Sequence, residues 1–135
     1  MMKNTKTAAR SAFRIEILSH EGPVALDATG TYDSFAAADR ALAPLAEANR
    51  GRLGYFKVDA LITHLPTGDE YRARYDMEDP AKAGAPNLAK WIVSACRFRA
   101  ETERGQKFLR MFSKSDEEFE AKRAGFAAWA KRIAG

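Results

Sequence analysis

Apolar and polar residues alternate with a period of two in three short segments, and this pattern constrains the fold more than any other feature of the sequence. The segments are 12–18, 55–64 and 71–77. A period of two puts successive side chains on opposite faces of a strand, so each segment predicts a β-strand with one apolar face. These faces are expected to form one packed interior, with Phe13, Ile15, Ile17, Phe56, Val58, Ala60, Ile62, Tyr71, Ala73, Tyr75 and Met77.

Turn residues join the strands into hairpins. Gly22 and Pro23 follow the first strand, and residues 24–29 are expected to return as its partner. Pro66 and Gly68 separate the other two strands, which therefore predict a second hairpin.

Apolar residues at helical spacing follow each hairpin. Asp33 or Ser34 can cap the first helix, in which Pro44 predicts a kink or a short restart, and residues 49–54 close it. A loop over 78–86 leads to the second helix.

The second helix is expected to be capped near Asn87 and to end by Gly105. One or two helical turns are expected over 106–113. Ser115 and Glu118 form a capping box, which predicts the start of the last helix.

This order of elements predicts an α+β fold. We expect a mainly antiparallel four-stranded sheet in ββα-ββ-α order, with helices on one face and a helical C-terminal extension. Residues 1–11 are expected to be a flexible tail, and 12–135 a single domain in which 100–135 is the extension. The length of 135 residues is ordinary for one domain.

The cysteine content indicates a cytoplasmic protein. Cys96 is the single cysteine, whereas a secreted domain usually carries paired cysteines. The first ten residues lack the apolar core of a secretory signal, and no stretch approaches the ~20 apolar residues of a membrane span. We therefore expect no membrane partner.

The sequence predicts no catalytic site, no metal and no cofactor. His20 and His64 are too far apart in the sequence, and from the cysteine, to predict a metal site. His20 could act as a general base beside Glu21, but a histidine at a strand end is more often a surface or hydrogen-bonding residue. Cys96 lies in mid-helix, which predicts a buried, inert thiol.

Two nucleotide-binding patterns are not supported. No pair of closely spaced glycines lies between a strand and a helix, as a phosphate-binding loop requires. The segment 54–58 is similar to the aromatic strand of an RNA-recognition fold, but Phe56 and Val58 share the core face and leave only Tyr55 on the other.

Positive charge is concentrated between residues 86 and 115, where seven basic residues stand against two acidic ones in a chain of net charge +4. The run 97–114 can track phosphates or an acidic protein surface, although a solvated helix face also explains it. The second hairpin adds basic residues whose simplest explanation is cross-strand ion pairing with Asp59 and Asp76. The candidate partner-binding residues are Arg97, Arg99, Arg104, Lys107, Arg110, Lys114, Lys57, Arg72 and Arg74.

Five short pieces of sequence resemble the large polyvalent protein-associated domains, small α+β modules of plasmids, phages and conjugative elements. The pieces are Phe13 to Ser19; Tyr32-Asp33-Ser34-Phe35; Ala37-Ala38-Asp39 with Leu42; Gly54-Tyr55 with Lys57 and Asp59; and Gly68 with Tyr71, Arg74, Tyr75 and Asp76. The resemblance covers about residues 12–100. The chain departs from the family in Leu65-Pro66-Thr67, where the family tends to be more polar, and in an expected stand-alone occurrence without fused enzyme domains.

The resemblance implies a mobile-element origin and no established catalytic residues. We expect a non-enzymatic binding protein that inhibits a host defence complex, through an anti-CRISPR or anti-restriction activity, so that its partner is a host protein or ribonucleoprotein. The alternative is a nucleic-acid-binding accessory factor for plasmid maintenance or transfer, which uses the segment 97–114. A small enzyme of unrecognised type is the third alternative.

Overall fold

The structure is a computed structural model that describes residues 12–21, 26–48, 56–77 and 85–134. Contacts within the chain group it into two compact units, Met1–Leu88 and Ala89–Gly135. The sequence instead placed the start of a helical extension at residue 100. A single folding domain stays a prediction, because a division by contacts does not say how the units unfold.

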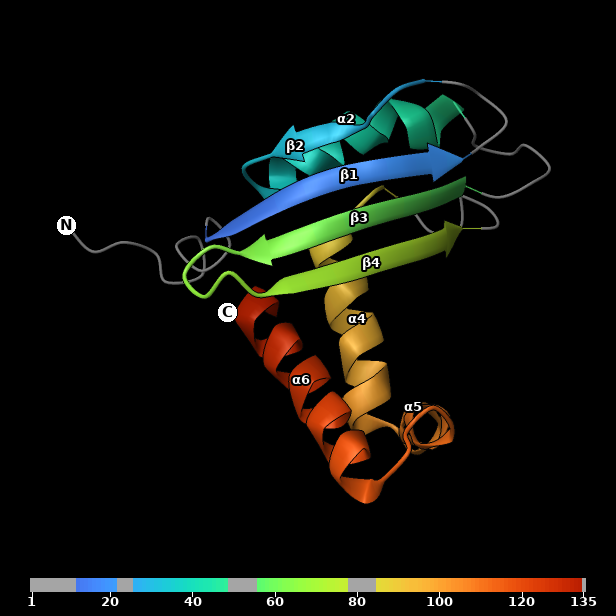
Figure 1. Ribbon diagram of the computed structural model, residues 1–135. Helices are drawn as coiled ribbons and strands as arrows, with labels where there is room; N and C mark the ends of the chain where they lie inside the picture. Colours follow the sequence, from blue (N-terminus) through green and yellow to red (C-terminus); the bar gives the residue numbers. More distant parts are fainter. Residues whose placement is uncertain (1–11, 22–25, 49–55, 78–84, 135) are drawn as a thin grey trace. The chain divides into compact units, whose positions relative to one another are not determined.

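The first unit contains a four-stranded antiparallel sheet, which confirms the predicted α+β fold (Figure 1). Its strands are β1 (Phe13–Glu21), β2 (Gly30–Tyr32), β3 (Phe56–His64) and β4 (Glu70–Met77). They lie in the order β2-β1-β3-β4, so both predicted hairpins join one sheet. The side chains of Phe56, Asp76 and Met77 and the whole of Tyr55 lie outside the described residues.

The strand predicted over 24–29 is wrong in position. Residues 26–29 form no strand, and β2 begins instead at Gly30, which pairs with Ile17. Asp27 explains the difference, because its carboxylate accepts hydrogen bonds from the Thr29 amide at 2.9 Å and the Thr29 hydroxyl at 2.6 Å. This local turn takes up an amide that a longer strand would need for its ladder.

One extra residue in β1 changes the face on which its end lies. Ile17 is paired with Ala60 and Ser19 with Asp59, so Leu18 is a bulge that breaks the alternation. As a result His20 lies opposite Val58, on the apolar face of the sheet.

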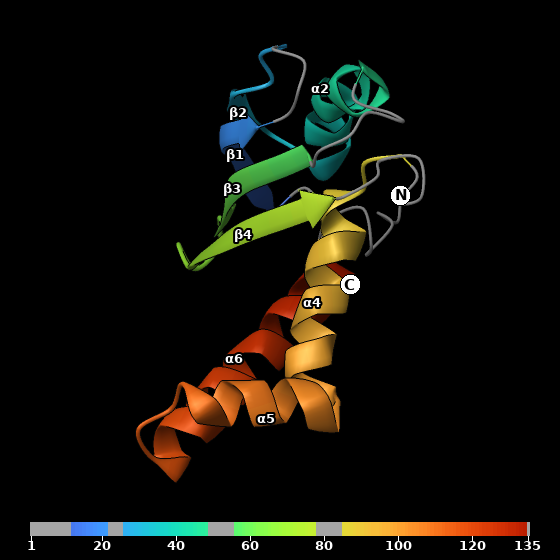
Figure 2. The ribbon, with the colours of Figure 1, turned by 90° about the vertical axis from the view of Figure 1, so that its right-hand side faces the viewer.

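Helix α2 (Phe35–Ala48) lies on one face of the sheet, as Figures 1 and 2 show. The Ser34 hydroxyl accepts a hydrogen bond from the Ala37 amide at 3.0 Å, so Ser34 is the capping residue. The helix is continuous through the exposed Pro44, and the expected restart does not occur. The core between α2 and the sheet includes Phe13, Ile15, Ile17, Phe35, Ala38, Leu42, Leu45, Val58, Ala60 and Ile62, all at most 2% exposed.

Three helices follow: α4 (Leu88–Glu101), α5 (Glu103–Met111) and α6 (Asp116–Ala134). The first amide of α4, that of Leu88, donates to the Asp39 carboxylate at 2.9 Å. None of the described helices is both long and apolar enough to cross a lipid bilayer.

Helix α4 ends before Gly105, as predicted, but the helical turns expected over 106–113 begin earlier, at Glu103. The Thr102 hydroxyl accepts a hydrogen bond from the Gly105 amide at 3.0 Å and so caps this helix. Gly105 therefore lies inside α5, where it is buried. Figure 2 shows α5 between the end of α4 and the start of α6.

The predicted start of α6 is confirmed, with one difference in the capping box. The Glu118 amide donates to the Ser115 hydroxyl at 3.1 Å, as predicted. The Glu118 carboxylate accepts from the Lys114 amide at 2.6 Å, one residue earlier than in the standard box, and lies 3.2 Å from the Lys122 ammonium. These two groups, the Lys114 amide first, lower the pKa of Glu118.

Acid is therefore expected to weaken the start of α6. Because the folded pKa of Glu118 lies below its ordinary value of 4.5, its contribution to stability is complete above that pH and is lost as the pH falls through the folded pKa. Urea unfolding should show Glu118→Gln to be less stable than the wild type at about pH 7, with the difference closing at about pH 3. An equal difference at both pH values would contradict this role.

Candidate functional site

Two basic residues of the second hairpin share one carboxylate on the outer face of the sheet. The Arg72 guanidinium donates to both oxygens of Asp59, at 3.0 and 2.7 Å, and the Arg74 Nε lies 3.9 Å from the same carboxylate. The hydrogen bond from Arg72 holds the pKa of Asp59 below its usual value. Lys57 also has an interaction of its own. Arg72 and Arg74 thus take part in the cross-strand ion pairing that the sequence predicts with Asp59.

Two of the six candidate residues in the second unit support its packing. The Arg110 guanidinium lies 2.8 Å from the Asp116 carboxylate and 4.1 Å from the centre of the Phe119 ring. Arg99 lies 5.2 Å above the Phe126 ring, which links α4 to α6. Cations over aromatic rings are attracted by the ring quadrupole, so both arginines stabilise the three-helix unit.

The other four candidates in this unit extend into solvent. Within the described ranges their side chains form no ion pair, and all four are exposed: Arg97, Arg104, Lys107 and Lys114. They lie in the second unit, whereas the hairpin residues lie in the first. The nine predicted residues therefore do not form one site in either unit.

Exposed apolar residues lie beside two of these basic residues, and the sequence analysis did not single them out. Phe108, Met111 and Phe112 are 49%, 75% and 63% exposed. They are three of the seven large apolar side chains that are exposed in the described part of the chain, and they fall within five consecutive positions. We define the α5 surface as Arg104, Lys107, Phe108, Met111, Phe112 and Lys114.

Helix geometry explains part of this exposure. Gly105 and Leu109, four residues apart, are buried and mark the inner side of α5. Met111 lies on the opposite side of the helix, Phe108 lies at its flank, and Phe112 follows the helix as its C-cap residue. The rings of Phe108 and Phe112 contact each other with centres 5.0 Å apart. A helical projection of residues 103–111 with Leu109 placed inward would have predicted the exposure of Met111, but not that of Phe112, which comes three residues after Leu109.

The α5 surface is anchored on both sides. The amide of Gly105 is bound by the Thr102 hydroxyl, and the Lys122 ammonium donates to the Phe112 carbonyl at 2.8 Å. The Phe112 amide also donates to the Leu109 carbonyl at 3.1 Å. The apolar side chains therefore project from a backbone that is fixed by hydrogen bonds.

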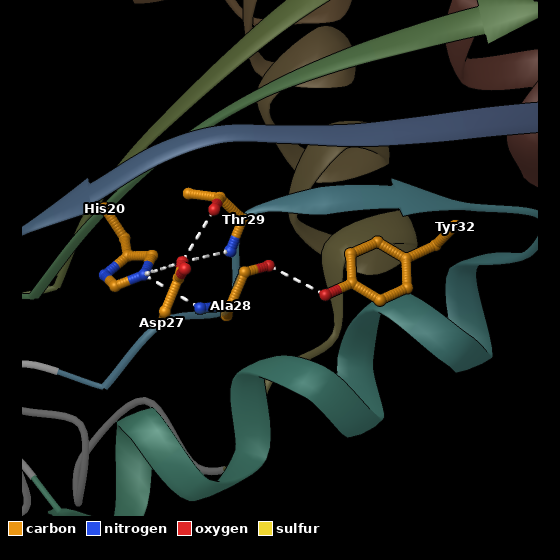
Figure 3. Close-up of polar contacts among 5 residues, drawn as sticks. All are labelled: His20, Asp27, Ala28, Thr29 and Tyr32. Atoms are coloured by element: carbon orange, nitrogen blue, oxygen red, sulfur yellow. Dashed lines mark hydrogen bonds and ion pairs between the residues drawn. The ribbon is translucent and has the colours of Figure 1, made fainter.

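His20 belongs to a polar cluster in the first unit (Figure 3). Its Nε2 atom accepts a hydrogen bond from the Ala28 amide at 3.0 Å and lies 3.8 Å from an Asp27 oxygen. The Tyr32 hydroxyl donates to the Ala28 carbonyl at 2.7 Å. The lone pair that a general base would use is thus occupied by a backbone amide, and His20 holds residues 27–28 against the end of β1.

The hollow beside His20 has a volume of about 320 Å³. Its acidic and basic side chains largely compensate one another in charge, and Asp59 and Arg74 belong to the ion-pair cluster of the outer face. The described lining residues are Ser19, His20, Glu21, Lys57, Val58, Asp59, Arg74 and Tyr75. Two of them that could act as bases are already bonded, because the His20 ring accepts from the Ala28 amide and the Asp59 carboxylate accepts from Arg72.

Replacement of His20 by alanine is expected to destabilise the protein by about 1–2 kcal/mol, because the half-buried Ala28 amide loses its acceptor. Thermal unfolding followed by circular dichroism measures the change. Asp27→Ala is the control, since its carboxylate is exposed and its bonds are local. A larger loss in Asp27→Ala than in the histidine variant would contradict this assignment.

The remaining candidates for chemistry are structural. The His64 ring packs 5.2 Å from the Phe13 ring, and its Nδ1 atom lies 2.8 Å from the Thr67 hydroxyl at the hairpin tip. Cys96 is buried, as predicted. Among the described residues, no three His, Cys, Asp or Glu side chains are placed to hold a metal ion.

No family model matches the chain, and neither the curated proteins nor the solved structures contain a significant match to it. The resemblance to the large polyvalent protein-associated domains therefore stays a prediction.

Proposed function

We propose that this chain is a cytoplasmic, non-enzymatic binding protein of a mobile genetic element, and that it inhibits a host defence complex by docking through the α5 surface. The observation that carries the proposal is the exposure of Phe108, Met111 and Phe112 at the C-terminal end of α5, which is anchored by hydrogen bonds.

Burial of such side chains favours a complex. About half to three-quarters of each of these large apolar side chains is exposed to water. A large apolar side chain gains about 1.5–3 kcal/mol when it becomes fully buried, and a few such residues usually dominate the energy of an interface. Arg104 and Lys107 beside them supply charge for steering and orientation.

The choice of a defence complex as the partner draws on the resemblance of residues 12–100 to a mobile-element family. A host nuclease or surveillance complex is blocked when a rigid protein covers its working surface. Such an inhibitor needs a docking surface and no catalytic groups, which agrees with a candidate site made of apolar and basic side chains.

Phage infection or plasmid transformation in cells with a CRISPR or restriction system provides the test. The wild type is expected to protect the invading element and to co-purify with the defence complex. Met111→Ser with Phe112→Ser should lose both effects, whereas Leu65→Ser, which removes an exposed apolar residue of the first unit, should keep them. Absence of protection and of co-purification across the defence systems tested would reject the proposal.

Nucleic-acid binding in plasmid maintenance or transfer is the second candidate function. It is favoured by the four exposed basic side chains that form no ion pair within the described ranges, Arg97, Arg104, Lys107 and Lys114. Phosphate contacts release counterions, so binding to an oligonucleotide should weaken steeply as salt rises. Binding that ignores salt would reject this function.

A further inference from the structure

We propose that the partner of the α5 surface is an acidic amphipathic helix of another protein, which packs along α5 with its apolar side chains on Phe108, Met111 and Phe112. The inference rests on the proposed function only in taking the α5 surface as the place where a partner binds. It adds the chemistry of that partner.

The spacing of the apolar residues fits a second helix. Phe108 and Met111 stand three residues apart in α5, so they are neighbours on its surface, and Phe112 is the C-cap residue directly after the helix. The nine residues of α5 extend for about 13 Å, or two and a half turns. A stripe of this length can be covered by three turns of a partner helix with apolar residues at the same spacing.

The basic residues beside these apolar side chains determine the sign of the charge that the partner must carry. Arg104 and Lys107 lie in the first two turns of α5, and Lys114 follows its end. Glu103 is the acidic residue of the helix, so positive charge remains in excess. In paired helices the charged residues that flank an apolar seam select partners of opposite sign. The partner is therefore expected to carry Asp or Glu beside its apolar stripe.

The same observations favour a protein over a nucleic acid. Single-stranded nucleic acids stack bases on open aromatic faces, but here the two rings contact each other at 5.0 Å. The most exposed of the three residues is Met111, at 75%, and a flexible thioether is typical of surfaces that adapt to protein side chains. Three basic residues on this surface would make few phosphate contacts.

A selection from displayed peptides tests the proposal without a known partner. The full chain is immobilised and presented with a library of random peptides of about 16 residues, long enough for four helical turns. Selected peptides are expected to be acidic, to show apolar residues at i, i+3, i+4 and i+7, and to become helical when bound. Neutral or basic peptides, peptides without this period, or no enrichment at all would overturn the proposal.

Paired variants locate the binding surface and separate the apolar contribution to binding from the electrostatic one. Met111→Ser should weaken the binding of the selected peptides by at least about tenfold, while Leu65→Ser leaves their binding unchanged. Lys107→Glu should weaken them by a similar factor, while Lys131→Glu, the same charge change on an exposed residue of α6, has little effect. Circular dichroism establishes that each variant is folded. Equal effects of Lys107→Glu and Lys131→Glu would show that the contact is not at α5.

Nucleic acid is the competing outcome. Single-stranded and duplex oligonucleotides of about 20 nucleotides are titrated into the same chain at about 150 mM salt. Tight binding that Lys107→Glu abolishes, together with a failed peptide selection, would replace the acidic helix by nucleic acid. Peptide binding without protection in the infection assay would reject the defence function and leave this inference standing. If Met111→Ser abolishes protection but no peptide is enriched, the defence function stands and this inference is rejected.

Discussion

Gly105→Ala is expected to cause the largest loss of stability in the second unit, by more than about 3 kcal/mol. A Cβ atom at this position would lie 1.9 Å from the Phe98 carbonyl oxygen and 2.6 Å from its carbon. Both atoms belong to the backbone at the end of α4, where the same oxygen accepts hydrogen bonds from Thr102. No side-chain rotation can relieve this clash, so α5 must move away from α4. Urea unfolding followed by circular dichroism measures the loss.

Gly125→Ala is the matched control for that experiment. It makes the same substitution inside α6, where an added Cβ meets no atom within 4 Å. Alanine favours a helix interior over glycine, so this variant should be more stable by up to about 1 kcal/mol. Equal destabilisation by the two substitutions would contradict the close approach of α5 to Phe98.

Phe13→Ala is expected to destabilise the first unit by about 3–5 kcal/mol. The ring of Phe13 is 1% exposed and lies between Phe35 at 5.6 Å and His64 at 5.2 Å, measured between ring centres. Its removal leaves a cavity where the start of β1 meets α2. The loss is a large part of the 5–15 kcal/mol by which a typical domain is stable, so the variant should begin to unfold at a much lower urea concentration.

Phe112→Ala provides the comparison for the same chemical change. This ring is 63% exposed and contacts Phe108 at the surface. Its removal should cost less than about 1.5 kcal/mol, since it takes away one aromatic contact and little burial. A loss as large as that of Phe13→Ala would mean that Phe112 is covered in the folded protein, which would remove it from the α5 surface.

Strands with strict alternation were the part of the fold that the sequence predicted well. In β3, the residues Val58, Ala60 and Ile62 lie at every second position and are buried as expected. The last helix was also correct, because Ser115 and Glu118 form its start through local hydrogen bonds. Both signals depend only on residues that are close in sequence.

The errors arose where a side-chain hydrogen bond to the backbone decided where an element begins. The bond between Asp27 and Thr29 accompanies the start of β2 at Gly30, after the segment in which the strand was predicted. The Thr102 cap starts a new helix that contains Gly105, which was expected to lie between two helices.

The candidate site was predicted only in part. Concentration of charge identified Arg104 and Lys107, but nothing in a list of basic residues separates them from Arg110, which is paired with Asp116. Phe108 and Met111 were not among the candidate residues. Met111 faces away from the buried Gly105 and Leu109 of α5, and Gly105 lies close to the end of α4.

The extra residue at Leu18 bears on how relatives of this protein can be found. Residues after position 18 point to the opposite face of the sheet from the one that the alternation before it predicts. This one-residue offset lets the imidazole of His20 reach the amide of Ala28. Selection would then act on the offset more than on the identity of the inserted side chain. Distant relatives are best sought by aligning the two halves of the strand separately, with position 18 free to vary.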